Sequence, residues 1–324
     1  MRTFAQPQVV VSKCLGFAAC RYNGVSLPDP FVEQLRPYVT YLPVCPEVEI
    51  GLGVPRDPIR VVLVEDAPRL LQPSTGADMT EAMQTFAQQH FETLHDIDGF
   101  VLKGRSPSCG IKDVKRYRGI ERGAMSDNKG RGFFGAAVLE HFPHLPVEEE
   151  GRLSNFTIRE HFLTALFTLA DFRAVQAAQT MRELVRFHSD NKLLLMAYNE
   201  TRLRVMGPLV ANHAQRPVAD VIADYAQHLT QALARPPRRT AGINVLMHAL
   251  GYFSKGLSSQ EKAYFLDTLE KYRDQKAPLS VPVSLIGAWI ARFNEPYLAR
   301  QTFFEPYPEA LITISDSGKG RALD

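Results

Sequence analysis

Two kinds of hydrophobic pattern divide this chain, and the change from one to the other constrains its fold most. Before about residue 154, short runs rich in Val, Ile, Leu or Tyr alternate with helical patterns, whereas the later residues are helical throughout. The strand-like runs, bounded by Gly or Pro, cover residues 8–12, 38–44, 59–64, 99–104 and 145–148. Strands that alternate with helices favour a mostly parallel sheet covered by helices. We therefore expect an open, Rossmann-like α/β domain over residues 1–153 and a separate all-α domain over residues 154–324.

The helical patterns have recognisable limits. In the first half they cover residues 78–97 and, more weakly, 132–142. In the second half, Gly or Pro residues separate segments expected near 155–171, 174–187, 190–206, 217–234, 241–255, 259–276 and 283–294. Ser258 followed by Glu261 predicts a capping box at the start of the 259–276 helix. Trp289 is expected in the core, and His188 is expected to be an ordinary core or surface polar residue.

Composition excludes several classes of protein. No apolar run approaches the roughly 18–20 residues that span a bilayer, so a membrane protein is not expected. The first 12 residues lack the pattern of a signal peptide, which favours a cytoplasmic location. Four cysteines are too few for a disulfide scaffold, and a reducing compartment leaves such thiols free for metal binding or catalysis.

Charge is distributed unevenly along the chain. The formal net charge is only +2, but residues 181–260 hold ten Lys or Arg against five Asp or Glu. This excess is compatible with a polyanion-binding surface and equally with solvated helix faces. Charge alone leaves both interpretations open.

Three cysteines follow predicted strands. Cys14 comes after the first strand, Cys45 after the second and Cys109 after the fourth. The loops beyond the carboxyl ends of parallel strands gather at one edge of a sheet, where ligands bind. A site with three thiolates suits either an iron–sulfur cluster with one open iron or a zinc ion completed by water, and Cys20 could close either one. The spacing does not decide between them, because no pair forms a CxxC motif.

Four ordered motifs carry a resemblance to a known family. They are Val11-Ser12-Lys13-Cys14-Leu15-Gly16, Cys20-Arg21-Tyr22-Asn23-Gly24, Pro43-Val44-Cys45-Pro46-Glu47 and Lys103-Gly104-Arg105-Ser106-Pro107-Ser108-Cys109-Gly110. Together they resemble the thiouracil desulfidase family over residues 8 to about 150. The two-domain arrangement is similar to that of bacterial desulfidases that act on 4-thiouridine in tRNA.

The resemblance implies a cofactor and a reaction. Cys14, Cys45 and Cys109 would hold a [4Fe-4S] cluster whose fourth iron binds the sulfur of a thiolated base, and Cys20 would not be a ligand. Hydrolysis would convert 4-thiouridine, in tRNA or as a nucleotide, to uridine and release sulfide without net redox change. The alternatives are a desulfidase of free thiouracil-type pyrimidines and a non-enzymatic zinc or iron–sulfur binding module.

This chemistry needs particular side chains. Exchange of C=S for C=O requires an activated water and proton transfer, and Glu47 beside Cys45 suits that role, with Ser106 as a second catalytic candidate. Substrate-binding candidates offer a cation, a stacking surface or a hydrogen bond, and they are Arg21, Tyr22, Asn23, Lys103 and Ser108. Arg235, Arg238 and Arg239 are the candidates for contacts with tRNA phosphates.

Overall fold

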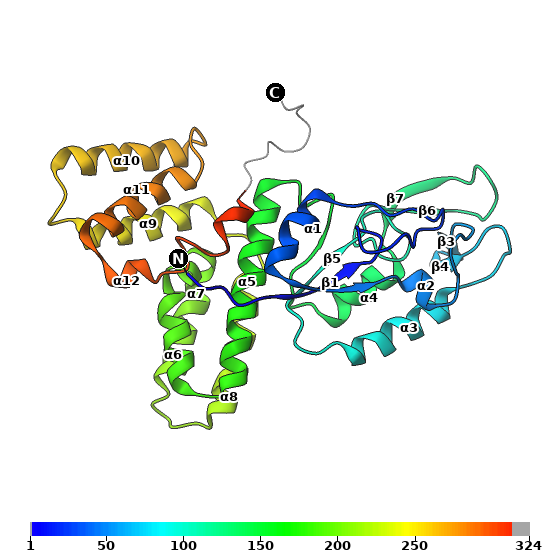
Figure 1. The fold of residues 1–324 in the computed structure, drawn as a ribbon, viewed down its shortest axis with the longest axis horizontal. Coiled ribbons are helices and arrows are strands. Elements are labelled where there is room, and N and C mark those ends of the chain that lie inside the picture. Colours follow the sequence, from blue (N-terminus) through cyan, green and yellow to red (C-terminus); the bar gives the residue numbers. More distant parts are fainter. Residues whose placement is uncertain (1, 313–324) are drawn as a thin grey trace. The chain divides into compact units, whose positions relative to one another are not determined.

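The structure is a computed structural model that describes residues 2–312 (Figure 1). The chain forms two compact units. The sheet unit contains residues 5–170 with 308–312, and the helical unit contains residues 171–307 with 2–4. Residues 313–324 of the predicted helical domain lie outside the described range.

The division between the units falls inside one long helix, α5 (Phe156–Ala178), rather than before it at residues 153–154. The first half of α5 packs within the sheet unit. Leu166 Cδ1 lies 3.0 Å from the position that a Cβ on Gly99 would occupy. The Arg159 guanidinium lies 5.9 Å from the centroid of the Phe31 ring. The change of sequence pattern near residue 154 therefore marks the start of α5 and not the limit of the sheet unit.

Sheet A confirms the predicted α/β class. Its four parallel strands are β1 (Gln8–Ser12), β2 (Thr40–Val44), β5 (Gly99–Leu102) and β8 (Val147–Glu149), in the order β2-β1-β5-β8. Val10 in the central strand is in register with Leu42 of β2 and Phe100 of β5. Val9, Val10 and Val11 are fully buried, as is typical of a parallel strand covered on both faces.

Helices cover the two faces of sheet A. Residues of α3 (Thr80–Thr93) and α4 (Phe133–His141) share one hydrophobic core with Val10 and Phe100. These helix residues are Met83, Ala87, Phe91, Phe134 and Val138. On the other face lie α5, which packs on Gly99, and α1 (Pro30–Leu35), where the Val32 carbonyl accepts a 3.0 Å hydrogen bond from the Tyr41 hydroxyl of β2. Successive side chains along each strand point to opposite faces, so each strand packs against helices on both sides.

A second sheet corrects the sequence-based assignment of residues 59–64. That strand, β3 (Arg60–Val64), belongs not to the parallel sheet but to sheet B. Sheet B also contains β4 (Ala67–Leu71), β6 (Val114–Tyr117) and β7 (Ser126–Gly130), in the order β4-β3-β6-β7. Two antiparallel hairpins, β3–β4 and β6–β7, join through a parallel β3–β6 pair. The last three of these strands had no counterpart in the sequence analysis, because they lack the apolar runs of buried strands.

Besides residues 171–178 of α5, the helical unit contains seven helices among its described residues. They are α6 (Met181–Asp190), α7 (Lys192–Ala211), α8 (Val218–Leu233), α9 (Arg239–Phe253), α10 (Ser259–Arg273), α11 (Ser280–Phe293) and α12 (Pro296–Ala299). The capping box of α10 is confirmed, since the Glu261 carboxylate accepts from Ser258 N–H at 2.7 Å and the Ser258 hydroxyl accepts from Glu261 N–H at 3.2 Å. Trp289 is buried as predicted. No helix within residues 2–312 is long and apolar enough to cross a lipid bilayer.

His188 lies between α6 and α8 in this unit. Its Nδ1 atom is 3.1 Å from the hydroxyl of Tyr225, which is fully buried. Burial, with a smaller contribution from the charge of Lys192, lowers the pKa of His188 to about 4. The folded unit therefore keeps this imidazole neutral through the physiological pH range.

We predict that the helical unit loses stability as the pH falls. An unfolded chain protonates His188 near pH 6.5, whereas the folded unit resists protonation down to about pH 4, so up to about 3 kcal/mol is lost across that interval. Trp289, the single tryptophan, lies in the core of this unit and reports its urea unfolding by fluorescence. His188→Gln should flatten the pH dependence, whereas His248→Gln at an exposed control position should not. Equal slopes for the two variants would contradict the assignment.

Candidate active site

One cavity of about 400 Å³ lies where the chain leaves the carboxyl ends of β1, β2 and β5. All four cysteines line it, namely Cys14, Cys20, Cys45 and Cys109. The three strands are parallel, so their carboxyl ends meet at one edge of sheet A. The structure thus places the three strand-end cysteines together, as their positions in the sequence predict. Their function as ligands stays a prediction.

Ser12 links the ends of β1 and β5 at this cavity. It is the last residue of β1, and its buried hydroxyl accepts a 2.8 Å hydrogen bond from the Lys103 N–H just after β5. Ser12 was not a candidate in the sequence analysis, because this contact crosses about 90 residues of chain.

The loop that carries Cys109 rests on the start of α4 without space for a side chain. A Cβ on Gly132 would lie 2.5 Å from the Ser108 carbonyl oxygen, and one on Gly135 would lie 2.5 Å from the Cys109 carbonyl oxygen. The Phe133 and Gly135 N–H groups donate to the carbonyl oxygens of Pro107 and Ser108. Glycines at these two positions therefore allow the helix backbone to hold the cysteine loop directly.

The environment of Cys14, Cys20 and Cys109 disfavours the ionised form of these thiols and raises their pKa. Burial, and secondarily the neighbouring Cys45, raises the pKa of Cys14 to about 11. Burial and the same neighbour raise the pKa of Cys20 to about 12, and burial also raises the pKa of Cys109. Opposing charges from Lys103 and Arg21 lower the pKa of Cys14. A bound cation would have to displace protons from these thiols.

The donor chemistry of the cavity fits an iron–sulfur cluster. Within residues 2–312, no three His, Cys, Asp or Glu side chains are close enough together to hold a single metal ion. Thiolates that each bind a different iron of a cluster do not have to converge on one point. Four thiols line one cavity whose wall also contains Arg21 and Lys103, so these residues would offer a cluster both thiolate ligands and positive charge.

Cys20 is closer to the other cysteines than its sequence position suggested. Its carbonyl oxygen accepts from Cys45 Sγ at 3.7 Å and from Arg56 Nη1 at 2.9 Å. The structure brings Cys20 into the cavity and leaves untested the expectation that it is not a ligand.

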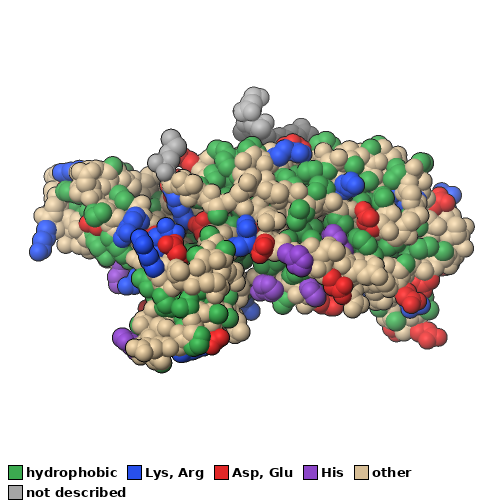
Figure 2. Space-filling model, turned by 60° about the horizontal axis from the view of Figure 1, so that its bottom comes forward, with side chains coloured by type: hydrophobic (Ala, Val, Ile, Leu, Met, Phe, Trp, Pro, Cys, Tyr) green, Lys and Arg blue, Asp and Glu red, His purple; other side chains and the backbone are tan. Residues whose placement is uncertain are grey.

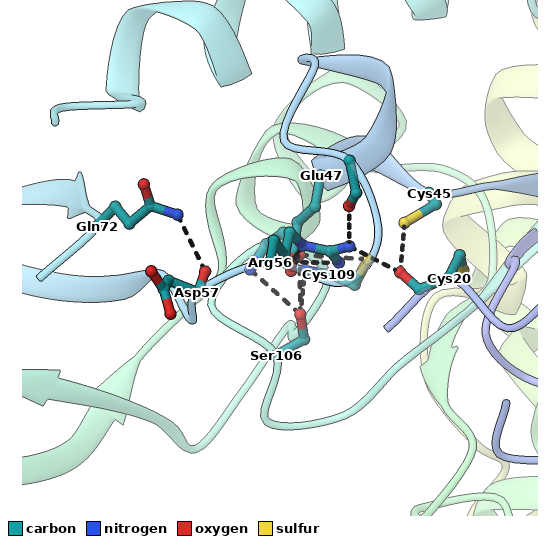
Figure 3. A network of polar contacts seen from close by, with 10 residues as sticks. Cys20, Cys45, Glu47, Arg56, Asp57, Gln72, Ser106 and Cys109 are labelled. Carbon is teal, nitrogen blue, oxygen red and sulfur yellow. Dashed lines mark hydrogen bonds and ion pairs between the residues drawn. The ribbon is translucent and has the colours of Figure 1, made fainter. Parts of the chain in front are cut away.

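Glu47 lies at the centre of a polar network in the cavity wall (Figure 3). It belongs to the short helix α2 (Pro46–Glu49), which begins directly after Cys45. Glu47 Oε2 accepts from Arg56 Nε at 2.8 Å, and Glu47 Oε1 accepts from the Ser108 hydroxyl at 2.7 Å. The side chains of Arg56 and Glu47 are only 4% and 14% exposed, so this ion pair is largely removed from water.

The hydrogen bonds between the two serines and Glu47 have a defined direction. Ser106 Oγ accepts from the N–H groups of Ser108 at 3.2 Å and Cys109 at 3.1 Å, and it lies 2.9 Å from Ser108 Oγ. Because Ser108 donates its only hydroxyl proton to Glu47, the proton between the serines must come from Ser106. The chain of donors therefore runs from Ser106 through Ser108 to the carboxylate.

Arg56 is the main residue that the sequence analysis missed. Besides Glu47, its guanidinium donates to the carbonyl oxygens of Cys20 and Gly53. Gln72 supports the following residue, donating at 3.1 Å to the Asp57 carbonyl oxygen (Figure 3). An Arg between Pro55 and Pro58, nine residues after Glu47, was the only sequence signal. Buried Arg–carboxylate pairs of this kind fix the orientation of the acid.

The proposed substrate-binding residues occupy different positions. Arg21 and Tyr22 line the cavity, with the guanidinium 5.5 Å from the ring centroid and the Tyr22 ring 40% exposed. Ser108 also lines it and is buried. Lys103 lines it too, but its ammonium is paired with Glu150. Asn23 is exposed and does not line the cavity.

The arginines proposed to bind RNA lie in the turn between α8 and α9 and at the start of α9. Arg235 and Arg238 are exposed, whereas Arg239 lies over the Tyr272 ring at 5.5 Å and donates to the Arg273 carbonyl oxygen at 3.4 Å. On the face shown in Figure 2, Lys and Arg side chains gather over the helical unit at the left of the view. None of these observations tests RNA binding.

Two family models match the chain. Residues 9–150 match the model described as 2-thiouracil desulfurase. Residues 192–308 match a model described as a protein of unknown function, DUF1722. The first match contains every proposed cavity residue, and the second contains the proposed RNA-binding arginines.

Individual proteins resemble parts of the chain. The uncharacterized protein YbgA of Escherichia coli K12 is 30% identical over 158 residues, which cover 48% of this chain and 93% of that protein. The uncharacterized protein YbbK of Bacillus subtilis 168 is 29% identical over 148 residues, covering 44% and 95%. A solved structure of the [4Fe-4S]-dependent thiouracil desulfidase TudS is 27% identical, covers 46% of this chain and 93% of that one, and has a TM-score of 0.37.

We predict that Gly132→Ala destabilises the sheet unit. The backbone of Gly132 is compatible with alanine, at φ −72°, so the effect should come from the 2.5 Å approach of the new Cβ to the Ser108 carbonyl oxygen. Such overpacking costs about 1–3 kcal/mol, measurable by urea unfolding, and should speed hydrogen exchange in residues 106–110. Gly151→Ala, where no atom lies within 4 Å, is the matched control. Equal stabilities would show that the cysteine loop does not need this contact.

Proposed function

Residues 9–150 belong to the 2-thiouracil desulfurase family, and from this premise we propose that the chain is an iron–sulfur desulfidase that converts 4-thiouridine, in tRNA or as a nucleotide, to uridine. The reaction adds one water to the C=S carbon and releases hydrogen sulfide, so it needs no external oxidant or reductant. The observation that carries the proposal is the cavity in which four thiols meet a buried, hydrogen-bonded glutamate.

Cys14, Cys45 and Cys109 are the residues that would hold a [4Fe-4S] cluster. Each follows a different strand of sheet A, and Ser12 and α4 hold the Cys109 loop against the ends of β1 and β5. Bound by three thiolates, the cluster would supply one iron without a protein ligand, a Lewis acid suited to a soft sulfur atom. Cys20 would stay protonated beside Cys45, which agrees with a pKa raised to about 12.

Glu47 would act as the general base through Ser108. Its carboxylate accepts from Ser108, which in turn accepts from Ser106, and Ser106 lines the cavity. A water in the cavity would pass a proton to the Ser108 hydroxyl, which keeps one lone pair beside the bond from Ser106, while Ser108 passes its own proton to Glu47 and the water oxygen attacks the C=S carbon. Ser106 would orient Ser108 for this transfer. Arg56 would act as a positioning residue, because its two donors to Glu47 Oε2 leave Oε1 directed at Ser108.

The remaining residues would bind the substrate and its carrier. Tyr22 offers an exposed ring for stacking on a pyrimidine, and Arg21 offers a cation at the same wall of the cavity. Lys103, held by Glu150, would place positive charge near the departing sulfur. Arg235, Arg238 and Arg239 of the helical unit would contact tRNA phosphates. The alternatives are a desulfidase of free thiouracil and a non-enzymatic zinc or iron–sulfur module.

An anaerobic assay separates these functions. Protein reconstituted with iron and sulfide would be offered free 4-thiouracil, 4-thiouridine monophosphate and thiolated tRNA, with sulfide release and loss of the thiobase absorbance as readouts. Turnover of the nucleotide and the tRNA supports the proposal, and turnover of the free base alone supports the first alternative. A colourless protein that contains zinc and has no activity would support the non-enzymatic module.

Single Cys→Ser variants should divide the four cysteines into ligands and one non-ligand. Iron and sulfide analysis should show a large loss of cluster for Cys14→Ser, Cys45→Ser and Cys109→Ser, because each removes the ligand of one iron. Cys20→Ser should keep its iron. If Cys20→Ser loses iron as completely as Cys14→Ser, the site is closed by four cysteines and no iron is open to substrate.

Glu47→Gln should keep the cluster and lose turnover. Gln is close to Glu in shape but cannot accept the proton, so kcat should fall by about 10²- to 10⁴-fold, the usual contribution of a general base. Glu49→Gln, at an exposed position of the same helix, controls for the change of charge and should retain activity. Full activity of Glu47→Gln with normal iron content would remove Glu47 from the mechanism.

A further inference from the structure

Residues 111–131 form a segment that leaves the cysteine loop at Gly110 and returns beside it at Gly132. Gly110 and Gly132 are joined by a 2.7 Å hydrogen bond from the Gly132 N–H to the Gly110 carbonyl oxygen. The first residues beyond Gly110 are also held, because the N–H groups of Ile111 and Lys112 donate to the Glu149 carboxylate at 2.7 and 3.2 Å. Between these points the chain forms the β6–β7 hairpin, which extends from the sheet unit in Figure 1.

This segment is strongly basic. Residues 111–131 contain seven Lys or Arg against three Asp or Glu. Two of the arginines are neutralised, Arg116 by Asp127 at 2.9 Å and Arg118 by Asp66 at 3.0 Å. The other five cations are exposed and have no ion-pair partner within the described chain: Lys112, Lys115, Arg122, Lys129 and Arg131.

The position of these cations distinguishes them from the charges that serve the thiols. The positive charges that lower the pKa of Cys14 and Cys20 belong to Lys103, Arg21 and Arg56, which lie in the cavity wall. The hairpin cations do not line the cavity. They are distributed from the base of the hairpin to Arg122 near its tip, over a length of roughly 20 Å at the rise of extended chain. Such a distribution matches a polymer with regularly spaced negative charge better than a small ligand.

We infer that the β6–β7 hairpin is a second RNA-binding surface, which holds the phosphate backbone of a thiolated RNA next to the cavity. This inference rests on the proposed function, in which the reacting base is part of a polyanion. A base inside the cavity requires its own backbone to pass over the cavity mouth, and the hairpin starts from the loop that carries Ser106, Ser108 and Cys109. Unpaired Lys and Arg side chains there contact phosphates without selecting a sequence.

The exposed tip supports the same assignment. Met125 is 80% exposed and Ile120 is 36% exposed, so two apolar side chains accompany Arg122 at the end of the hairpin. Apolar groups of this kind pack on the faces of unstacked bases or on riboses, whereas the flanking cations bind phosphates. The hairpin thus combines the two kinds of contact that single-stranded or looped RNA offers.

The test compares two triple variants of the full-length, cluster-loaded protein. The hairpin variant carries Arg122→Gln, Lys129→Gln and Arg131→Gln. The charge-matched control carries Arg36→Gln, Arg69→Gln and Arg300→Gln, at exposed positions outside the hairpin, the cavity and the Arg235–Arg239 turn. Binding of labelled bulk tRNA is measured by fluorescence anisotropy between about 50 and 200 mM salt, together with iron content and kcat/KM for free 4-thiouracil.

The hairpin variant should bind tRNA about tenfold more weakly than the control at low salt. Its plot of log affinity against log salt should be flatter by about 2, because each lost phosphate contact removes somewhat less than one released counterion. Iron content and activity on free 4-thiouracil should be unchanged. In the wild type, ultraviolet cross-linking to tRNA should give modified peptides from residues 115–131.

Three outcomes would overturn the inference, and a fourth would overturn the proposed function on which it rests. Equal tRNA affinity and salt dependence in the hairpin variant and the control would overturn the inference alone. A parallel loss of iron, free-base activity and tRNA binding would make the hairpin a structural element. Cross-links confined to the helical unit would place the whole RNA surface there. Wild-type protein that turns over free 4-thiouracil but does not bind tRNA would instead remove tRNA from the proposed function.

Discussion

The parallel pairing of β1 with β2 on one side and β5 on the other is the constraint on which the cavity depends. It brings residues from three distant parts of the sequence to one edge of sheet A, where Cys14, Cys45 and Cys109 leave the strands. Ser12 strengthens this arrangement, since its hydroxyl accepts a hydrogen bond from the backbone just after β5. The thiols can therefore share one cavity although the loops that carry them have unrelated sequences.

The parts of the fold that could be predicted are those in which burial shapes the local sequence. β1 is buried on both faces and has a continuous apolar run, so its limits agree with the sequence prediction. The α10 capping box was equally predictable, because both of its hydrogen bonds lie within four residues. Sheet B was not. β6 and β7 are rich in polar and charged residues and only partly buried, and the β3–β4 turn uses Glu65 and Asp66 at positive φ instead of the usual glycine signal.

In the candidate site, too, the sequence predicted positions that depend on local structure and missed contacts between distant residues. Cysteines just after strands could be identified because their position depends only on the direction of the strands. The contacts that organise the acid could not, since Arg56 reaches Glu47 and Cys20 through a loop whose path depends on sheet B and on Gln72. Likewise, Glu150 is separated from Lys103 by 47 residues, so the sequence suggested a free lysine where the structure shows an ion pair.

The closed base of the β6–β7 hairpin has a consequence for how this architecture can vary. Because β6 also pairs with β3 and Val114 belongs to the core, the part that can be lengthened, shortened or replaced is the turn between β6 and β7, residues 118–125. Cys109 and the two serines lie outside that segment and are held by α4. The tip of the hairpin is therefore the exchangeable part, because a change in its surface chemistry leaves sheet B and the cysteine loop in place. A scaffold of this kind can change the charge that it presents beside the cavity by altering the residues of one turn.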